Sequence, residues 1–266
     1  MQESKIERKT ILSVILLIIF LGGVGFYIYT DTKKRSSNNS ASNVPEKTTT
    51  SEGDPGYTIK QIPVENSAPT AKIPNLNRAI IFRADISQEV REIVTKNITR
   101  LTTSLKEDST QFGDWLELGV QYKIAGDYEG AKGAWEYAGF LGPETYIPWN
   151  NLGDLYVNYL KDYPKGEMYY RKSIEKKIDY IQGYRALYEL YYFSYKEKWN
   201  LADDILLEGL SKNPKSTDLM ILLAQYYKET GDTTNARTYY QKALTEAKAQ
   251  GNTTLTDLLK QELQTL

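Results

Sequence analysis

The feature that most constrains this chain is a motif that returns after 34 residues. The segment WLELGVQY begins at Trp115, and the segment WNNLGDLY begins at Trp149. A fixed period of about 20–50 residues is typical of repeat proteins, in which each unit is too small to bury its own apolar face and stacks on its neighbours. The sequence therefore predicts a stack of similar units in the C-terminal half of the chain.

Large and small side chains alternate at helical spacing within the first unit. The residues that carry this pattern are Trp115, Leu118, Gly119, Tyr122, Ala131, Trp135, Ala138 and Pro143. The first four predict one face of a first helix, and the next three line a second helix. Gly126 separates them, since glycine adopts the backbone angles of a turn without strain, and the proline ends the second helix. Each unit is thus predicted to be a helix–turn–helix.

The pattern resembles the tetratricopeptide repeat, whose period is about 34 residues. The resemblance covers residues 112–250, with copies at 112–145, 146–180, 181–214 and 215–250. It implies an all-α fold: a right-handed superhelical solenoid of about four helix pairs. Because the end repeats of a solenoid leave an apolar side open, we expect flanking helices at 87–106 and 252–266 to cover them. An extended segment at 72–86 is expected to dock through Ile80, Ile81 and Phe82.

The N-terminal part of the chain predicts a membrane anchor. After a tail at 1–10, residues 11–29 contain no charge and would form a helix of roughly 28 Å, close to the thickness of a bilayer core. A cleaved signal peptide would have a shorter apolar region and a small-residue cleavage site, which the following TDTKKRSS lacks. Residues 30–71 are rich in Ser, Thr, Asn, Pro and Gly and predict a disordered tether.

Lysine and arginine do not decide the orientation of this single span, because three precede it and three follow it. A short tail before one span is the usual arrangement of a signal anchor with its tail inside. We therefore expect a single-pass protein of the cell membrane whose repeats lie outside the cytoplasm.

Composition argues against several classes of function. The chain has no Cys and no His, which removes thiolate chemistry, the commonest proton-transfer group and the commonest transition-metal ligand. Its net charge is −1, whereas a general nucleic-acid binder shows a basic excess. No phosphate-binding or nucleophile motif is present. We expect neither an enzyme nor a cofactor, and no nucleic-acid or small-molecule partner.

The family resemblance implies a protein or peptide partner bound in a concave groove lined by the first helices. Carrying the groove positions over repeat by repeat gives Lys123, Asn150, Asp154, Asn158, Arg185, Glu189, Tyr192, Gln225 and Lys228. Leu116 and Val120 occupy places where family members that clamp chaperone tails have Lys and Asn, which argues against that ligand. The alternative for each position is a solvated helix face. The alternative for the whole chain is a structural or self-associating component of a cell-envelope assembly.

Overall fold

The computed structural model describes residues 72–266, and the predicted tail, membrane helix and tether lie outside this range. Every regular element of the described part is helical, in agreement with the predicted all-α class. Its α-helices are α2 (Gln88–Glu107), α3 (Phe112–Ala125), α4 (Tyr128–Leu141), α5 (Ile147–Asp154), α6 (Tyr163–Lys176), α7 (Ile181–Glu189), α8 (Ala202–Lys212), α9 (Thr217–Glu229), α10 (Thr233–Ala249) and α11 (Thr253–Gln264). None of them is both long and apolar enough to cross a bilayer.

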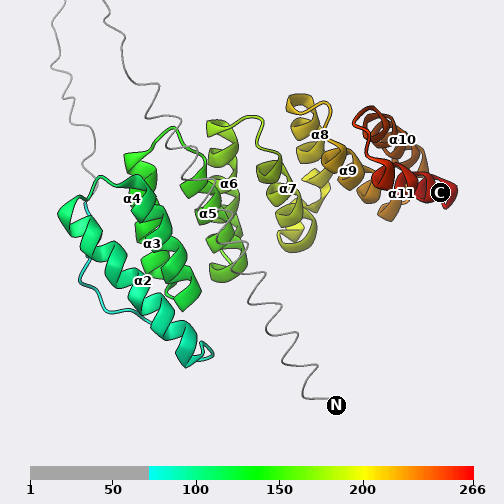
Figure 1. Ribbon diagram of the computed structural model, residues 1–266. Coiled ribbons are helices and arrows are strands. Elements are labelled where there is room, and N and C mark those ends of the chain that lie inside the picture. Colours follow the sequence, from blue (N-terminus) through cyan, green and yellow to red (C-terminus); the bar gives the residue numbers. More distant parts are fainter. Residues whose placement is uncertain (1–71) are drawn as a thin grey trace, which may run out of the picture. The chain divides into compact units, whose positions relative to one another are not determined.

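The helices pack in pairs that follow one another in chain order (Figure 1). Helix α3 packs on α4, α5 on α6, α7 on α8 and α9 on α10, and each pair also contacts the next. This arrangement confirms the helix pairs predicted from the 34-residue period.

Small residues let the two helices of a pair approach each other. Trp115 and Trp135 are at most 1% exposed, and the Trp135 Nε1 donates to the Leu116 carbonyl at 3.1 Å. A Cβ on Gly119 would lie 2.3 Å from that same Nε1, so the indole occupies the room that the glycine leaves. In the second pair Tyr170 fills the space beside Gly153 in the same way. The alternation of bulky and small residues therefore sets the spacing of the helices.

The first helices of the second and third pairs end in π-helical turns, which the periodicity did not predict. These segments are η1 (Leu155–Leu160) and η2 (Leu190–Ser194). Lys161 lies 12 residues after Trp149, whereas Gly126 lies 11 residues after Trp115. A π turn takes up one more residue than an α turn, so η1 accommodates this extra residue inside the helix. Lys161 then adopts the left-handed conformation (φ 57°) that glycine holds at position 126 (φ 83°).

The third pair carries two extra residues between the aromatic residue of its first helix and the alanine of its second helix. Ala202 lies 18 residues after Tyr184, whereas Ala131 lies 16 after Trp115. The segment η2 is followed by a 3₁₀ helix, η3 (Lys196–Leu201), before α8 begins. The longer connection is therefore compact and helical.

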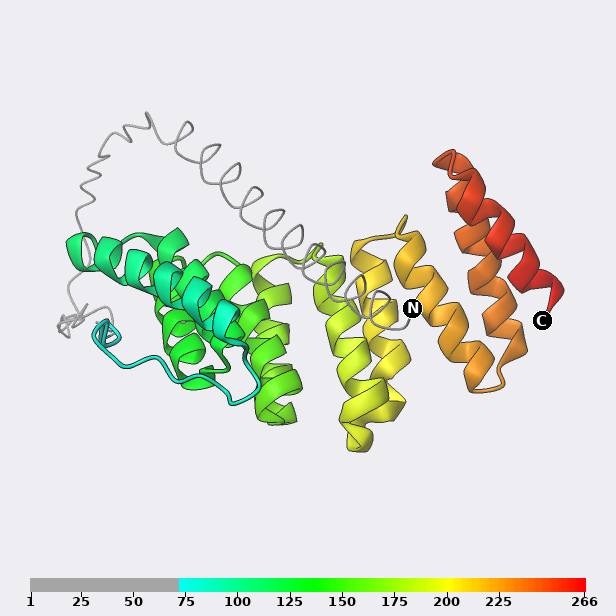
Figure 2. The same ribbon diagram turned by 60° about the horizontal axis from the view of Figure 1, so that its bottom comes forward.

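The N-terminal end of the stack is covered by α2 and by residues 72–86, which run along the first helices (Figure 2). Ser87 caps α2 by accepting from the Val90 amide. Arg78 forms an ion pair with Asp127 at 2.9 Å and lies 5.0 Å from the Tyr122 ring centroid. Ile81 is 60% exposed, so the expectation that its side chain docks is wrong; its backbone amide donates to Asp127 instead.

The C-terminal end is covered by α11, whose inner face buries Leu259. On its outer side Asp257 and Lys260 form an ion pair at 2.9 Å, and Leu258 remains 54% exposed. Both ends of the stack are thus closed, and the described residues 72–266 belong to one compact unit. The buried core of the described residues runs from Val94 in α2 to Leu259 in α11, so we expect residues 72–266 to fold on their own.

Candidate functional site

The nine predicted groove residues come from the first helix of each pair, and we call them the first-helix face. Lys123 lies on α3, Asn150 and Asp154 on α5, Asn158 on η1, Arg185 and Glu189 on α7, Tyr192 on η2, and Gln225 and Lys228 on α9. All nine are at least partly exposed. The structure shows that most of them also bind one another or a residue of the next pair.

Lys123 and Asp154 join the first two helix pairs. The Lys123 ammonium lies 2.9 Å from Asp154 Oδ2, and the Asn158 amide donates to Oδ1 of the same carboxylate at 2.7 Å. The Lys123 and Asp154 side chains are 29% and 31% exposed. The ammonium also lies 5.4 Å from the ring centroid of Tyr159, which gives it an aromatic neighbour.

Arg185 joins the third pair to the fourth. Its guanidinium lies 2.9 Å from Glu189 and 3.4 Å from Asp218 of α9. The hydrogen bond to Glu189 raises the pKa of Arg185 above its ordinary value, so the group remains a cation. Both neighbours are more than 40% exposed, and water therefore screens these ion pairs.

Tyr192 makes a second link between the third and fourth pairs. Its hydroxyl donates to Glu229 Oε2, which raises the pKa of Tyr192 to about 12 and keeps the hydroxyl protonated as a donor. The ring packs edge-on against Phe193, with centroids 4.9 Å apart. Phe193 is itself 62% exposed. An apolar ring therefore stands beside the polar row.

Lys228 completes the row with an ion pair to Glu262 of α11 at 2.9 Å. Two residues differ from the rest: the side-chain amides of Asn150 and Gln225 form no hydrogen bond with any of the described residues. Each of these amides presents both a donor and an acceptor. They are the groups of the first-helix face that a peptide backbone could bind without displacing another side chain.

Sequence reasoning missed the three acidic partners Asp218, Glu229 and Glu262. Each lies 33–37 residues after the residue that it binds, which is about one repeat. An acidic residue about one period after a cation or a tyrosine hydroxyl was therefore the signal that could have found them. These contacts tie neighbouring pairs together across the face.

The chemistry available on this face is recognition by hydrogen bonds, charge and aromatic contact. Within residues 72–266 no group of three acidic side chains comes together that could hold a metal ion. Ion pairs between such exposed groups contribute about 0–1 kcal/mol. A ligand can therefore open them at small cost and use both partners.

Comparison with known protein families identifies one part of the stack. Residues 217–250 match the family model of the tetratricopeptide repeat. That segment is the α9–α10 pair. No curated protein sequence matches the chain.

Several solved structures resemble the chain at low sequence identity. The crystal structure of MamA is 18% identical, covers 62% of this chain and 98% of its own, and gives a TM-score of 0.48. YrrB, described as a TPR protein with an unusual peptide-binding site, is 17% identical over 65% and 84% of the two chains, with a TM-score of 0.44. PilW, a type IV pilus biogenesis factor, is 21% identical over 67% and 90%, with a TM-score of 0.40.

Proposed function

We propose that this chain is a non-catalytic tetratricopeptide-repeat scaffold that binds a protein or peptide partner on the first-helix face. One observation carries the proposal: exposed polar and aromatic side chains form a row across successive first helices. Its screened ion pairs open at small cost, and Asn150 and Gln225 offer side-chain amides that have no hydrogen-bond partner within residues 72–266. A peptide with a few polar anchors suits such a surface.

Photo-crosslinking in the full-length protein tests this assignment. A photoreactive amino acid at Gln225 should capture a protein, whereas one at Glu175 of α6, whose side chain is 73% exposed, should not. The substitution Arg185→Glu should weaken capture, because it reverses a charge on the face. Arg100→Glu is the matched control, since Arg100 is also ion-paired and exposed but lies on α2. Equal capture from both sides of the repeats would contradict the proposal.

The proposal includes a single membrane anchor at residues 11–29, with the repeats on the extracytoplasmic side. Its support is the uncharged 19-residue segment of the sequence. Extraction of membranes with alkaline carbonate should leave the protein in the pellet, and a topology reporter fused after Leu266 should be active only outside the cytoplasm. Release into the supernatant would refute the anchor.

Self-association is the alternative role, and the closed C-terminal end disfavours it. An array that grows end to end needs an apolar outer helix face, whereas the exposed Leu258 of α11 is flanked there by the Asp257–Lys260 ion pair. Sedimentation of residues 72–266 should therefore give a monomer over a wide range of concentration. A stable oligomer would favour the structural role instead.

A further inference from the structure

A second surface lies at the turns of the second and third repeats, where both repeats contain extra residues. We call it the turn surface: Lys161, Lys165, Phe193, Lys196, Glu197 and Trp199. These six exposed residues come from the η1–α6 connection and from the η2–η3 connection. None of them belongs to the first-helix face.

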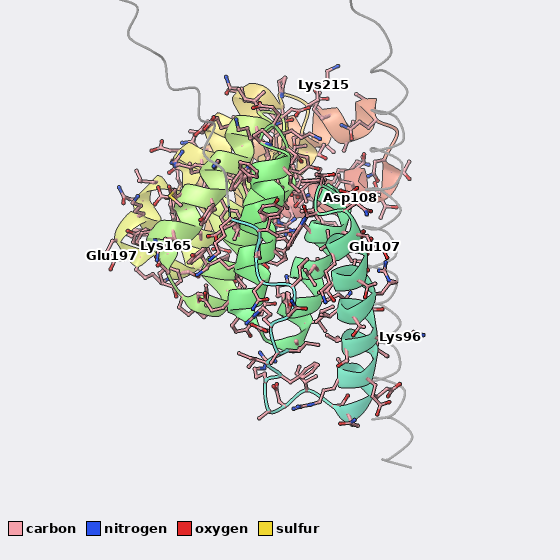
Figure 3. The ribbon with its side chains drawn as sticks, turned by 90° about the vertical axis from the view of Figure 1, so that its left-hand side faces the viewer. Lys96, Glu107, Asp108, Lys165, Glu197 and Lys215 are labelled. Atoms are coloured by element: carbon pink, nitrogen blue, oxygen red, sulfur yellow. The ribbon has the colours of Figure 1, made fainter. Side chains whose placement is uncertain are left out.

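The two connections lie side by side. The rings of Tyr163 and Tyr195 have centroids 6.1 Å apart, and the Lys198 ammonium donates to Glu167 Oε2 at 2.6 Å. Lys165 and Glu197 project on the same side of the repeats (Figure 3). Residues that are far apart in the sequence thus form one continuous edge.

The apolar part of the turn surface is unusually exposed for aromatic side chains. Phe193 is 62% exposed and Trp199 is 49% exposed. The other three tryptophans of the chain, Trp115, Trp135 and Trp149, are at most 8% exposed. Phe193 lies in η2 and Trp199 in η3, two segments that pack on each other, and exposed apolar side chains on neighbouring segments are candidates for an interaction site.

The charged part is basic in a protein whose net charge is −1. Lys165 is neutralised by Asp162 at 2.7 Å, and Lys198, beneath the surface, by Glu167. Among the described residues, no carboxylate lies within ion-pair distance of Lys161 or Lys196. Glu197 is the one acidic residue of the six, and it forms no ion pair with a described lysine or arginine. The surface therefore carries a small positive excess.

We propose that the turn surface docks on a bilayer that contains anionic lipid. Tryptophan and other aromatic side chains prefer the membrane–water interface, and lysine stems lie along apolar surface while their ammonium groups reach the headgroups. Tryptophan and phenylalanine are common in protein interfaces as well, but lysine is depleted from their centres, so the lysines favour a lipid partner over a second protein surface. Docking goes beyond the proposed peptide binding, and its chemistry needs neither the first-helix face nor the anchor.

The buried state of three tryptophans makes the test selective. Residues 72–266, which form a closed unit, are mixed with vesicles of phosphatidylcholine alone or with an equal part of phosphatidylglycerol. Brominated acyl chains quench only tryptophan that enters the bilayer, so the signal reports Trp199. We expect quenching with the mixed vesicles and less with phosphatidylcholine alone. In the full-length protein reconstituted in the same vesicles, quenching should be stronger.

Variants separate docking from misfolding. Trp199→Phe should remove the quenchable part of the tryptophan fluorescence, and Trp199→Ala should weaken sedimentation with vesicles by roughly tenfold. Lys161→Gln should weaken it by about fivefold, and Glu197→Gln should strengthen it by a similar factor. Leu258→Ala, at an equally exposed apolar position on α11, should change it less than twofold.

Several outcomes would overturn the inference. They are an absence of quenching, binding that Trp199→Ala leaves intact, equal loss with Leu258→Ala, or a crosslink from Trp199 to protein alone. Capture of a partner at Gln225 is measured separately and should survive Trp199→Ala. Failure of docking is thereby distinguished from failure of the peptide-binding proposal.

Discussion

Asp127 fastens residues 72–86 to the repeats, and its removal can be measured against a matched aspartate. Asp127 accepts from the Gly130 amide at 3.0 Å and so caps α4, while it also binds Arg78 and the Ile81 amide. Asp232 occupies the equivalent turn of the fourth repeat and caps α10 through the Asn235 amide at 3.0 Å. No arginine or lysine forms an ion pair with Asp232 in the described part of the chain.

Asparagine caps a helix about as well as aspartate, so an Asp→Asn change isolates the ion pair from the cap. We expect Asp232→Asn to change the free energy of unfolding by less than about 0.5 kcal/mol. Asp127→Asn removes a carboxylate that is 1% exposed and leaves Arg78, 25% exposed, without its counter-charge. Breaking a fully buried pair costs about 3–5 kcal/mol, and partial exposure of the arginine lowers this to about 2 kcal/mol.

Thermal unfolding of residues 72–266 followed by circular dichroism provides the assay. For a domain of this size 1 kcal/mol corresponds to roughly 2–4 °C, so Asp127→Asn should lower Tm by about 4–8 °C. A double-mutant cycle with Arg78→Ala should show coupling of about 1 kcal/mol or more. Equal Tm values for the two Asp→Asn variants, or additive effects in the cycle, would show that this ion pair does not hold the segment.

Three further predictions concern packing, pH and backbone strain. Gly119→Ala should cost about 1–3 kcal/mol in urea unfolding because of the Trp135 indole, whereas Gly133→Ala, with nothing within 4 Å, should stabilise its helix by about 0.5–1 kcal/mol. Burial opposes ionisation of Glu167, but hydrogen bonds from Lys198, Tyr191 and Arg171 outweigh it and lower its pKa. The stability that Glu167 contributes is therefore present above its unfolded pKa of about 4.3 and lost as pH falls through its folded pKa, so the advantage of wild type over Glu167→Gln should shrink on acidification. Lys161→Gly should raise stability by about 1 kcal/mol in the same urea experiment, since glycine adopts φ 57° without strain; a loss would contradict this.

The helix pairs could be predicted because local pattern and tertiary packing agree in this chain. The sequence pattern predicts that Trp115 and Gly119 face a second helix, and the structure buries both, with Gly119 against Trp135 and Trp115 against Tyr137. The packing of Leu258 was less predictable. The spacing of the leucines in α11 would suit a helix packed on one side as well as a helix packed on two sides. Because α11 is the last helix of the stack, Leu258 has no helix beside it and remains exposed.

The π turns could not be predicted from the pattern, because an extra residue can lengthen a loop or widen a helix. The choice depends on whether Asp162 must still cap α6, which it does by accepting from the Lys165 amide at 3.2 Å. The same limit applies to the first-helix face. Positions carried over one repeat at a time predicted Arg185 and Tyr192, but the pattern did not predict that Asp218 and Glu229 would bind them.

The π turn in the second repeat gives the array a tolerance to changes in chain length. A single added residue leaves Trp149 and Tyr170 in their places, as the contacts beside Gly139 and Gly153 show. An insertion of one residue here changes the surface of one repeat and leaves the packing against the next repeat unchanged. The surfaces of neighbouring repeats can thus diverge by single-residue insertions, while the interface between the repeats is preserved.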